Sequence, residues 1–111
     1  GTVTSIIIKE IEVARIPMQV HFRFGEKPGR LENVLLSPVR EDDNTLTHFL
    51  DIEAMVVQKY GNPWTSASGQ ERSSQWTLAG TIMSLKLIRL PITGSLLISF
   101  MYRPRVQRPP I

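Results

Sequence analysis

One segment in the middle of the chain, residues 44–63, has both a helical period and a clear end. Its apolar side chains recur at spacings typical of an amphipathic helix. The repeating set is Leu46, Phe49, Leu50, Val56, Val57 and Tyr60, with Glu53 as its only polar member. Lys59, Gly61 and Pro63 mark the end, because glycine adopts conformations that terminate helices and proline cannot continue one. We expect a helix over about residues 45–60, capped by a side-chain oxygen from residues 42–45.

The residues before this helix have the composition of β-strands. Residues 3–13 are rich in β-branched side chains, and residues 18–24 alternate apolar and polar side chains, as in a half-buried strand. Residues 31–36 are expected to form the next strand, after a turn rich in glycine and proline at residues 25–30. Arg15, Ile16 and Pro17 are expected to break or bulge the first run, because Pro17 cannot donate a ladder hydrogen bond.

The residues after the helix are also predicted to form strands, but only after a loop. The polar residues 64–74 have no apolar period, so we expect a loop there. Strands are expected at residues 75–78, 81–90 and 95–102. A short turn at residues 91–94 joins the last two, which predicts an antiparallel hairpin.

The order of these elements is βββ, helix, βββ, which predicts an α+β domain with a mostly antiparallel sheet of about six strands. The helix is expected to pack on one face of the sheet through Phe49, Val56 and Tyr60. We expect a single domain over residues 1–102. Residues 103–111 contain three prolines and three arginines and are expected to form a flexible basic tail.

Composition narrows the possible functions. The chain has no cysteine, which excludes disulfide scaffolds, thiol catalysis and cysteine-based zinc sites. No apolar run approaches the roughly 18–20 residues that span a bilayer, and no segment has the pattern of a signal peptide. All ten acids lie in residues 1–71, whereas residues 72–111 hold six Lys and Arg residues, half of them in the last nine positions. This asymmetry is a weak indication of an acidic partner.

No catalytic pattern is visible in the sequence. His21 and His48 lack the spacing of a metal site, and Asp51 and Glu53 do not share a helix face. The serines of residues 66–74 lack a nucleophile-elbow pattern. We therefore predict a protein that is not an enzyme and has no cofactor or metal, with a hydrolase whose site is unrecognised as an alternative.

Aromatic and basic side chains are the better candidates for binding. Trp64 follows the helix end, where an exposed tryptophan can anchor a partner, whereas Trp76 is expected in the core. His21 and Arg23 lie on the polar side of a predicted strand. The other weak candidates for binding are the basic residues of the tail: Arg103, Arg105 and Arg108.

The order of several short motifs resembles a loose group of small bacterial secreted or lipoprotein-type α+β domains. The motifs are Phe22 and Phe24, then Leu31, Val34 and Leu36, then Lys59, Tyr60, Gly61 and Pro63, then Trp76, Thr81, Ile82 and Leu85, and finally Phe100 or Tyr102. The resemblance implies a location in the periplasm or cell envelope. Members of the group often have an additional helix before the first strand, and none is visible here.

Taken together, the pattern favours a non-enzymatic bacterial domain that binds another macromolecule, most simply a protein, or self-associates through free sheet edges. The alternative is a nucleic-acid or anionic-surface binder that uses the basic C-terminal section. Of the two partner classes we favour protein, because aromatic and basic residues are not interleaved in the way that nucleic-acid binding requires.

Overall fold

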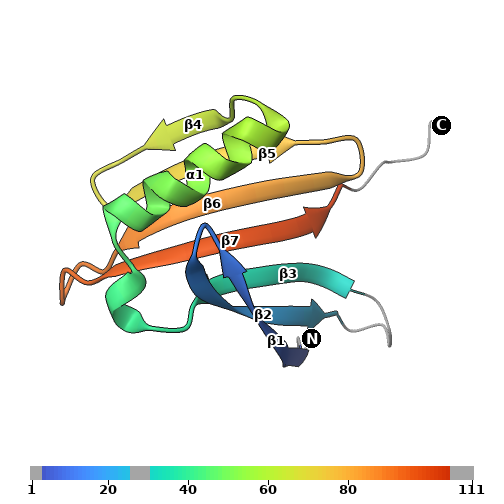
Figure 1. Cartoon of the computed structure of the whole chain (residues 1–111), viewed down its shortest axis with the longest axis horizontal. Coiled ribbons are helices and arrows are strands. Elements are labelled where there is room, and N and C mark those ends of the chain that lie inside the picture. Colours follow the sequence, from blue (N-terminus) through green and yellow to red (C-terminus); the bar gives the residue numbers. More distant parts are fainter. Residues whose placement is uncertain (1–3, 26–30, 106–111) are drawn as a thin grey trace.

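The computed structural model describes residues 4–25 and 31–105, which form seven strands, one α-helix and a short 3₁₀ helix. The elements are β1 (Thr4–Val13), β2 (Ile16–Phe24), β3 (Leu31–Pro38), η1 (Glu41–Asp43), α1 (Leu46–Tyr60), β4 (Trp64–Ala67), β5 (Glu71–Thr77), β6 (Thr81–Arg89) and β7 (Leu96–Pro104). All neighbouring strands are antiparallel, in the order β1-β2-β3-β7-β6-β5-β4 (Figure 1). The α+β class, the antiparallel sheet and the single main helix are therefore confirmed.

The predicted count of six strands is wrong, because residues 64–74 are not a loop. They contain β4 and the first half of β5, joined by a tight hairpin. All four residues of β4 are exposed, so burial imposes no apolar alternation on them. On β5 the small polar side chain of Ser74 is buried where an apolar residue is usual. The period that reveals a strand is therefore missing from the sequence.

The break predicted at residues 15–17 is present, because β1 ends at Val13 and β2 begins at Ile16, but Pro17 does not cause it. The chain reverses at Ala14 and Arg15, whose φ angles of 51° and 67° suit a two-residue hairpin turn. Pro17 lies within β2, and its carbonyl accepts a hydrogen bond from the Val39 amide just beyond β3. The N–H and C=O of a strand residue point the same way, so the N–H that Pro17 lacks would also face β3. This position lies at the end of the β2–β3 ladder, where a missing donor is tolerated.

The C-terminal boundary lies further along the chain than expected. β7 continues through Pro104, and the Arg105 amide donates to the Gly80 carbonyl at 3.1 Å. Arg103 therefore belongs to the sheet and not to the predicted tail. The rest of the predicted tail, residues 106–111, and most of the predicted turn at residues 25–30 lie outside the described residues.

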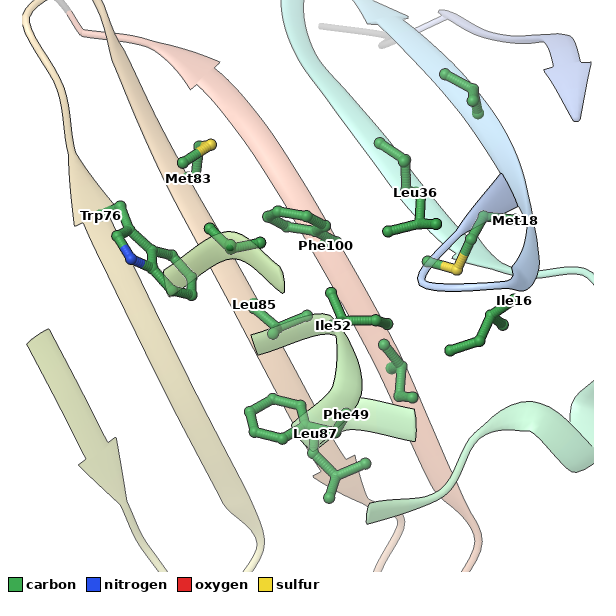
Figure 2. Close-up of a cluster of buried hydrophobic side chains, with 14 residues drawn as sticks. Ile16, Met18, Leu36, Phe49, Ile52, Trp76, Met83, Leu85, Leu87 and Phe100 are labelled. Carbon is green, nitrogen blue, oxygen red and sulfur yellow. The ribbon is translucent and has the colours of Figure 1, made fainter. Parts of the chain in front are cut away.

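The core lies between α1 and one face of the sheet. Phe49 and Ile52 point from α1 toward the central strands, where Leu85 is fully buried (Figure 2). The remaining buried apolar residues are Val13, Ile16, Met18, Val20, Leu36, Val56, Trp76, Met83, Leu87, Ile98 and Phe100. The predicted inward side of the helix is correct for Phe49 and Val56 but wrong for Tyr60, which is 42% exposed. Ile52 lies at the centre of the buried stripe of α1, although the set of apolar residues predicted from the sequence omits it.

The start of α1 is held by two side chains from the predicted capping segment. Thr45 Oγ1 accepts a hydrogen bond from the His48 amide at 3.1 Å, which identifies Thr45 as the N-cap. Asn44 Oδ1 accepts from the Ile98 amide at 2.7 Å. The β3–β7 ladder involves only residues 34–36 and 100–102, so Asn44 satisfies an amide that β3 does not reach.

The end of α1 is held by Gly61 and Trp76. Gly61 has φ 92° and ψ −169°, and its amide donates to the Val57 carbonyl at 2.8 Å. The indole N–H of Trp76 donates to the Gly61 carbonyl, also at 2.8 Å. Trp76 is only 4% exposed, which confirms its predicted place in the core. This bond ties the helix end to β5 and so positions the start of β4.

Replacing Gly61 by alanine is expected to lower the free energy of unfolding by about 1–3 kcal/mol, because this combination of φ and ψ is almost restricted to glycine. Added bulk is not the cause, since no atom lies within 4 Å of the added Cβ. Gly69→Ala is the matched control, because its Cβ also meets open space and its φ is not in the positive range. Urea unfolding measures both, and equal stabilities would contradict the cap assignment.

Candidate functional site

The two edges of the sheet, β1 and β4, differ in how they are protected. Edge strands commonly carry charges, bulges or prolines that prevent pairing with another chain. β1 has a register shift between Ile7 and Lys9, and the charged side chains of Lys9, Glu10 and Glu12 are exposed. β4, with the sequence Trp-Thr-Ser-Ala, has no charged residue, no proline and no register shift. β4 is therefore the edge that can accept an additional strand.

The outward-facing backbone groups of β4 follow from its pairing with β5. The Ser68 amide donates to the Glu71 carbonyl at 2.8 Å, so this pair closes the hairpin through hydrogen bonds. Bonded and non-bonded pairs alternate along an antiparallel ladder. Thr65 and Ala67, which lie opposite Ser74 and Arg72, therefore direct their N–H and C=O groups away from β5. Those groups form the free edge.

Trp64 opens this strand and is 71% exposed. Its register partner is Gln75, so its side chain lies on the face of the sheet opposite α1. The structure thus places Trp64 at the free edge, where its ring can contact a side chain of a neighbouring chain. Trp64 and Trp76 are close in sequence but lie on opposite faces, one exposed and one buried.

A cavity of about 390 Å³ lies beside β4 on the helix side of the sheet. It is lined by Glu53, Thr65, Ser66, Ala67, Arg72, Ser73 and Ser74. α1 packs over the central strands and leaves β4 uncovered, as the exposure of all four β4 residues shows (Figure 1). The cavity therefore lies along the free edge.

The cavity has opposite charges at its two ends. Glu53 accepts a short hydrogen bond from the hydroxyl of Ser74, a residue only 1% exposed. The Arg72 guanidinium lies 5.8 Å from the centre of the Phe49 ring, a cation–π geometry. Neither charge forms an ion pair with any other described residue. Arg72 and Ser74 are next but one on β5, so their Cα atoms are about 7 Å apart.

Three of the predicted binding residues, His21, Arg23 and Arg103, lie on the other, uncovered face of the sheet. His21 pairs with Leu35, and Arg23 pairs with Asn33, whose Oδ1 is buried without a hydrogen-bond partner among the described residues. Asn33 and Arg103 line one cavity of about 230 Å³. The structure thus brings Arg23 and Arg103 to the two sides of Asn33.

That cavity is also lined by Tyr102, which points toward the core side of the sheet. Burial, and to a lesser extent the charge of an ionised Tyr60, raise the pKa of Tyr102 above its ordinary value. Lys86, elsewhere on the uncovered face, is paired with Glu71 at 3.3 Å. Arg105 directly follows β7, and Arg108 lies outside the described residues.

His48 and the acids near it are structural. His48 Nδ1 lies 3.0 Å from the Asp43 carbonyl oxygen, and the Asp43 carboxylate pairs with Arg40 at 3.2 Å. These contacts fix η1 against the first turn of α1. Within residues 4–25 and 31–105, no group of three or more metal-ligating side chains is brought together.

No family model, curated protein or solved structure matches the chain. The resemblance to bacterial envelope domains therefore stays a prediction. In the part of the chain that the structure describes, the helix is too short and too polar to cross a membrane.

Sequence reasoning identified Trp64 but missed Glu53, Arg72 and Ser74. Glu53 did leave a signal, because it is the only polar residue in the apolar stripe of the helix. A carboxylate in that position needs a polar partner, and the structure supplies Ser74. Arg72 and Ser74 could not be identified, because their segment has no strand period.

Proposed function

We propose that this chain is a binding domain without catalytic activity, which takes up an extended segment of another protein as an additional strand along β4. The observation that carries the proposal is the contrast between the two edges: β1 has a bulge and exposed charges, and β4 has neither. In this mode of recognition, backbone hydrogen bonds supply affinity, and pockets for alternate side chains supply specificity. β4 offers both, through Thr65 and Ala67 and through the adjacent cavity.

Trp64 supports the same proposal from the other face of the sheet. A strand added to β4 places every second side chain beside Trp64 and Ser66, whose register partners lie on the uncovered face. An exposed tryptophan gives a large apolar contact at low entropic cost, and tryptophan is common among residues that dominate binding energy.

The chemistry of the cavity supports binding rather than catalysis. The hydroxyl of Ser74 donates directly to Glu53, and Ser74 is only 1% exposed, so this hydroxyl is poorly accessible as a nucleophile. We propose that these groups recognise side chains of the added strand. A location in the bacterial cell envelope belongs to the proposal through the resemblance alone.

The anionic-partner alternative has less support. Arg23 and Arg103 do share the uncovered face, but its described aromatic side chain, Trp64, lies at the far edge, three strands from Arg103. Binding of single-stranded nucleic acid requires aromatic side chains among the basic ones.

Ala67→Pro is expected to weaken peptide binding by roughly tenfold or more, since it removes an outward N–H that an added strand would use. The fold should be retained, because that N–H does not bond to β5. Ala67→Val is the matched control, since it keeps the N–H and favours a strand. Heptapeptides selected from a random phage library on the full chain provide the ligands, and isothermal calorimetry measures their affinity.

Two results would contradict the proposal. One is that Ala67→Pro, with an unchanged melting transition, binds the selected peptides as tightly as Ala67→Val does. The other is that the library yields no peptide with measurable affinity for the chain.

A further inference from the structure

The side of β4 that faces α1 determines which residues of an added strand enter the cavity. Thr65 and Ala67 lie opposite Ser74 and Arg72, so all four side chains share the helix side of the sheet. The residues of an added strand that stand opposite Ala67 and Thr65 also direct their side chains to that side. Two positions of the ligand, separated by one residue, therefore face the cavity.

These two positions face opposite charges. The position opposite Ala67 faces Arg72 across the smallest side chain of β4, and the position opposite Thr65 faces Ser74 and the Glu53 carboxylate bonded to it. Arg72 and Arg89 also line a neighbouring cavity of about 170 Å³, together with Glu71, whose carboxylate pairs with Lys86. Strands are about 4.8 Å apart, so a ligand residue lies about 10 Å from its counterpart on β5, a gap that two long side chains can close.

The direction of the added strand fixes the order of the two charges. Every neighbouring pair in this sheet is antiparallel, and antiparallel pairing is slightly more stable per residue than parallel pairing. A strand antiparallel to β4 passes Ala67 first and Thr65 second. Resting on the proposed function, we infer that the ligand is an extended protein segment with an acidic residue, any residue, and then a basic residue.

A second copy of this chain, joined through its own β4, fits the cavity less well. β4 is Trp-Thr-Ser-Ala and carries no charged side chain to place beside Arg72 or Glu53. Charge complementarity therefore favours a segment of a different protein.

Three peptides of equal length test the inference on the full chain. They are Thr-Thr-Glu-Thr-Arg-Val-Thr, the order-reversed Thr-Thr-Arg-Thr-Glu-Val-Thr and the neutral Thr-Thr-Gln-Thr-Gln-Val-Thr, all with blocked ends. The first is expected to bind about fivefold more tightly than either control, which is the range of a partly exposed ion pair. Glu53→Gln and Arg72→Gln should each reduce this preference, and Gln at position 53 still accepts from Ser74.

The outcomes of this experiment distinguish a wrong charge order from a failure of strand addition itself. If all three peptides bind equally and all lose affinity in Ala67→Pro, strand addition stands and the charge order is wrong. The inference is also overturned if the reversed peptide binds best, if none of the three binds, or if both glutamine variants weaken all three alike. A chain that dimerises in light scattering, with Ala67→Pro monomeric, would show that the occupant is a second copy.

Discussion

Replacing Trp76 by alanine is expected to lower the free energy of unfolding by about 3–5 kcal/mol, the range for truncating a large buried aromatic residue. Trp76 is 4% exposed and fills the core between α1 and β5. Its indole also donates to the Gly61 carbonyl, so truncation leaves the helix end without that partner. Urea unfolding followed by circular dichroism measures the change.

Two control variants separate these contributions. Trp76→Phe keeps most of the buried ring but loses the donor to Gly61, and is expected to cost about 1–3 kcal/mol. Trp64→Phe, at a site 71% exposed, is expected to change stability by less than about 0.5 kcal/mol. A larger loss in Trp64→Phe than in Trp76→Phe would contradict the assignment of one tryptophan to the core and the other to the edge.

Phe49→Ala is expected to have a comparable effect, a loss of about 3–5 kcal/mol. Phe49 is fully buried between α1 and β6, and the Arg72 guanidinium lies over its ring. Phe49→Leu keeps an apolar side chain of similar size and is expected to cost less than about 1.5 kcal/mol. Thermal and urea unfolding check both, and an alanine variant as stable as the leucine variant would contradict the packing of α1.

Phe49→Leu also tests how Arg72 is positioned. Loss of the ring removes the cation–π contact, whereas the fold is retained. The preference for the acidic residue of the ligand should therefore fall in this variant, although the preference for the basic residue, which depends on Glu53, should not.

The elements that the sequence predicts well are those with a burial pattern. In β6, Met83, Leu85 and Leu87 in the core alternate with the polar residues 84 and 86 outside. Gly61 and Pro63 end the helix for local steric reasons. Local conformation and one-sided burial both act within a few residues, so a single sequence reveals them.

The parts that the sequence did not predict depend on contacts between distant residues. β4 is exposed on every residue, and β5 buries Ser74 because Glu53, far away in sequence, bonds to its hydroxyl. The turn at Ala14 and Arg15 uses positive φ angles without glycine. In each case the register of the sheet imposes a structure that local preference does not show.

The candidate site also contains both features that the sequence indicates and features that only the fold reveals. Trp64 could be identified from the sequence, because a large aromatic residue directly after a helix end is expected to be exposed. His21 and Arg23 are predicted on the polar side of a strand, which the sheet register confirms, whereas Arg103 is predicted in the tail. The register places all three on the uncovered face, away from the β4 edge. The cavity itself required the placement of α1 over the central strands.

The most direct test of strand addition at β4 is amide hydrogen exchange, measured by NMR on the full chain with and without a saturating selected peptide. Exchange is expected to slow by at least about tenfold at Thr65 and Ala67, because a bound strand protects the groups that it bonds to. Ser66, already bonded to β5, and Glu10 on the β1 edge should change little. Unchanged exchange at Thr65 and Ala67, or new protection along β1 instead, would contradict strand addition at β4.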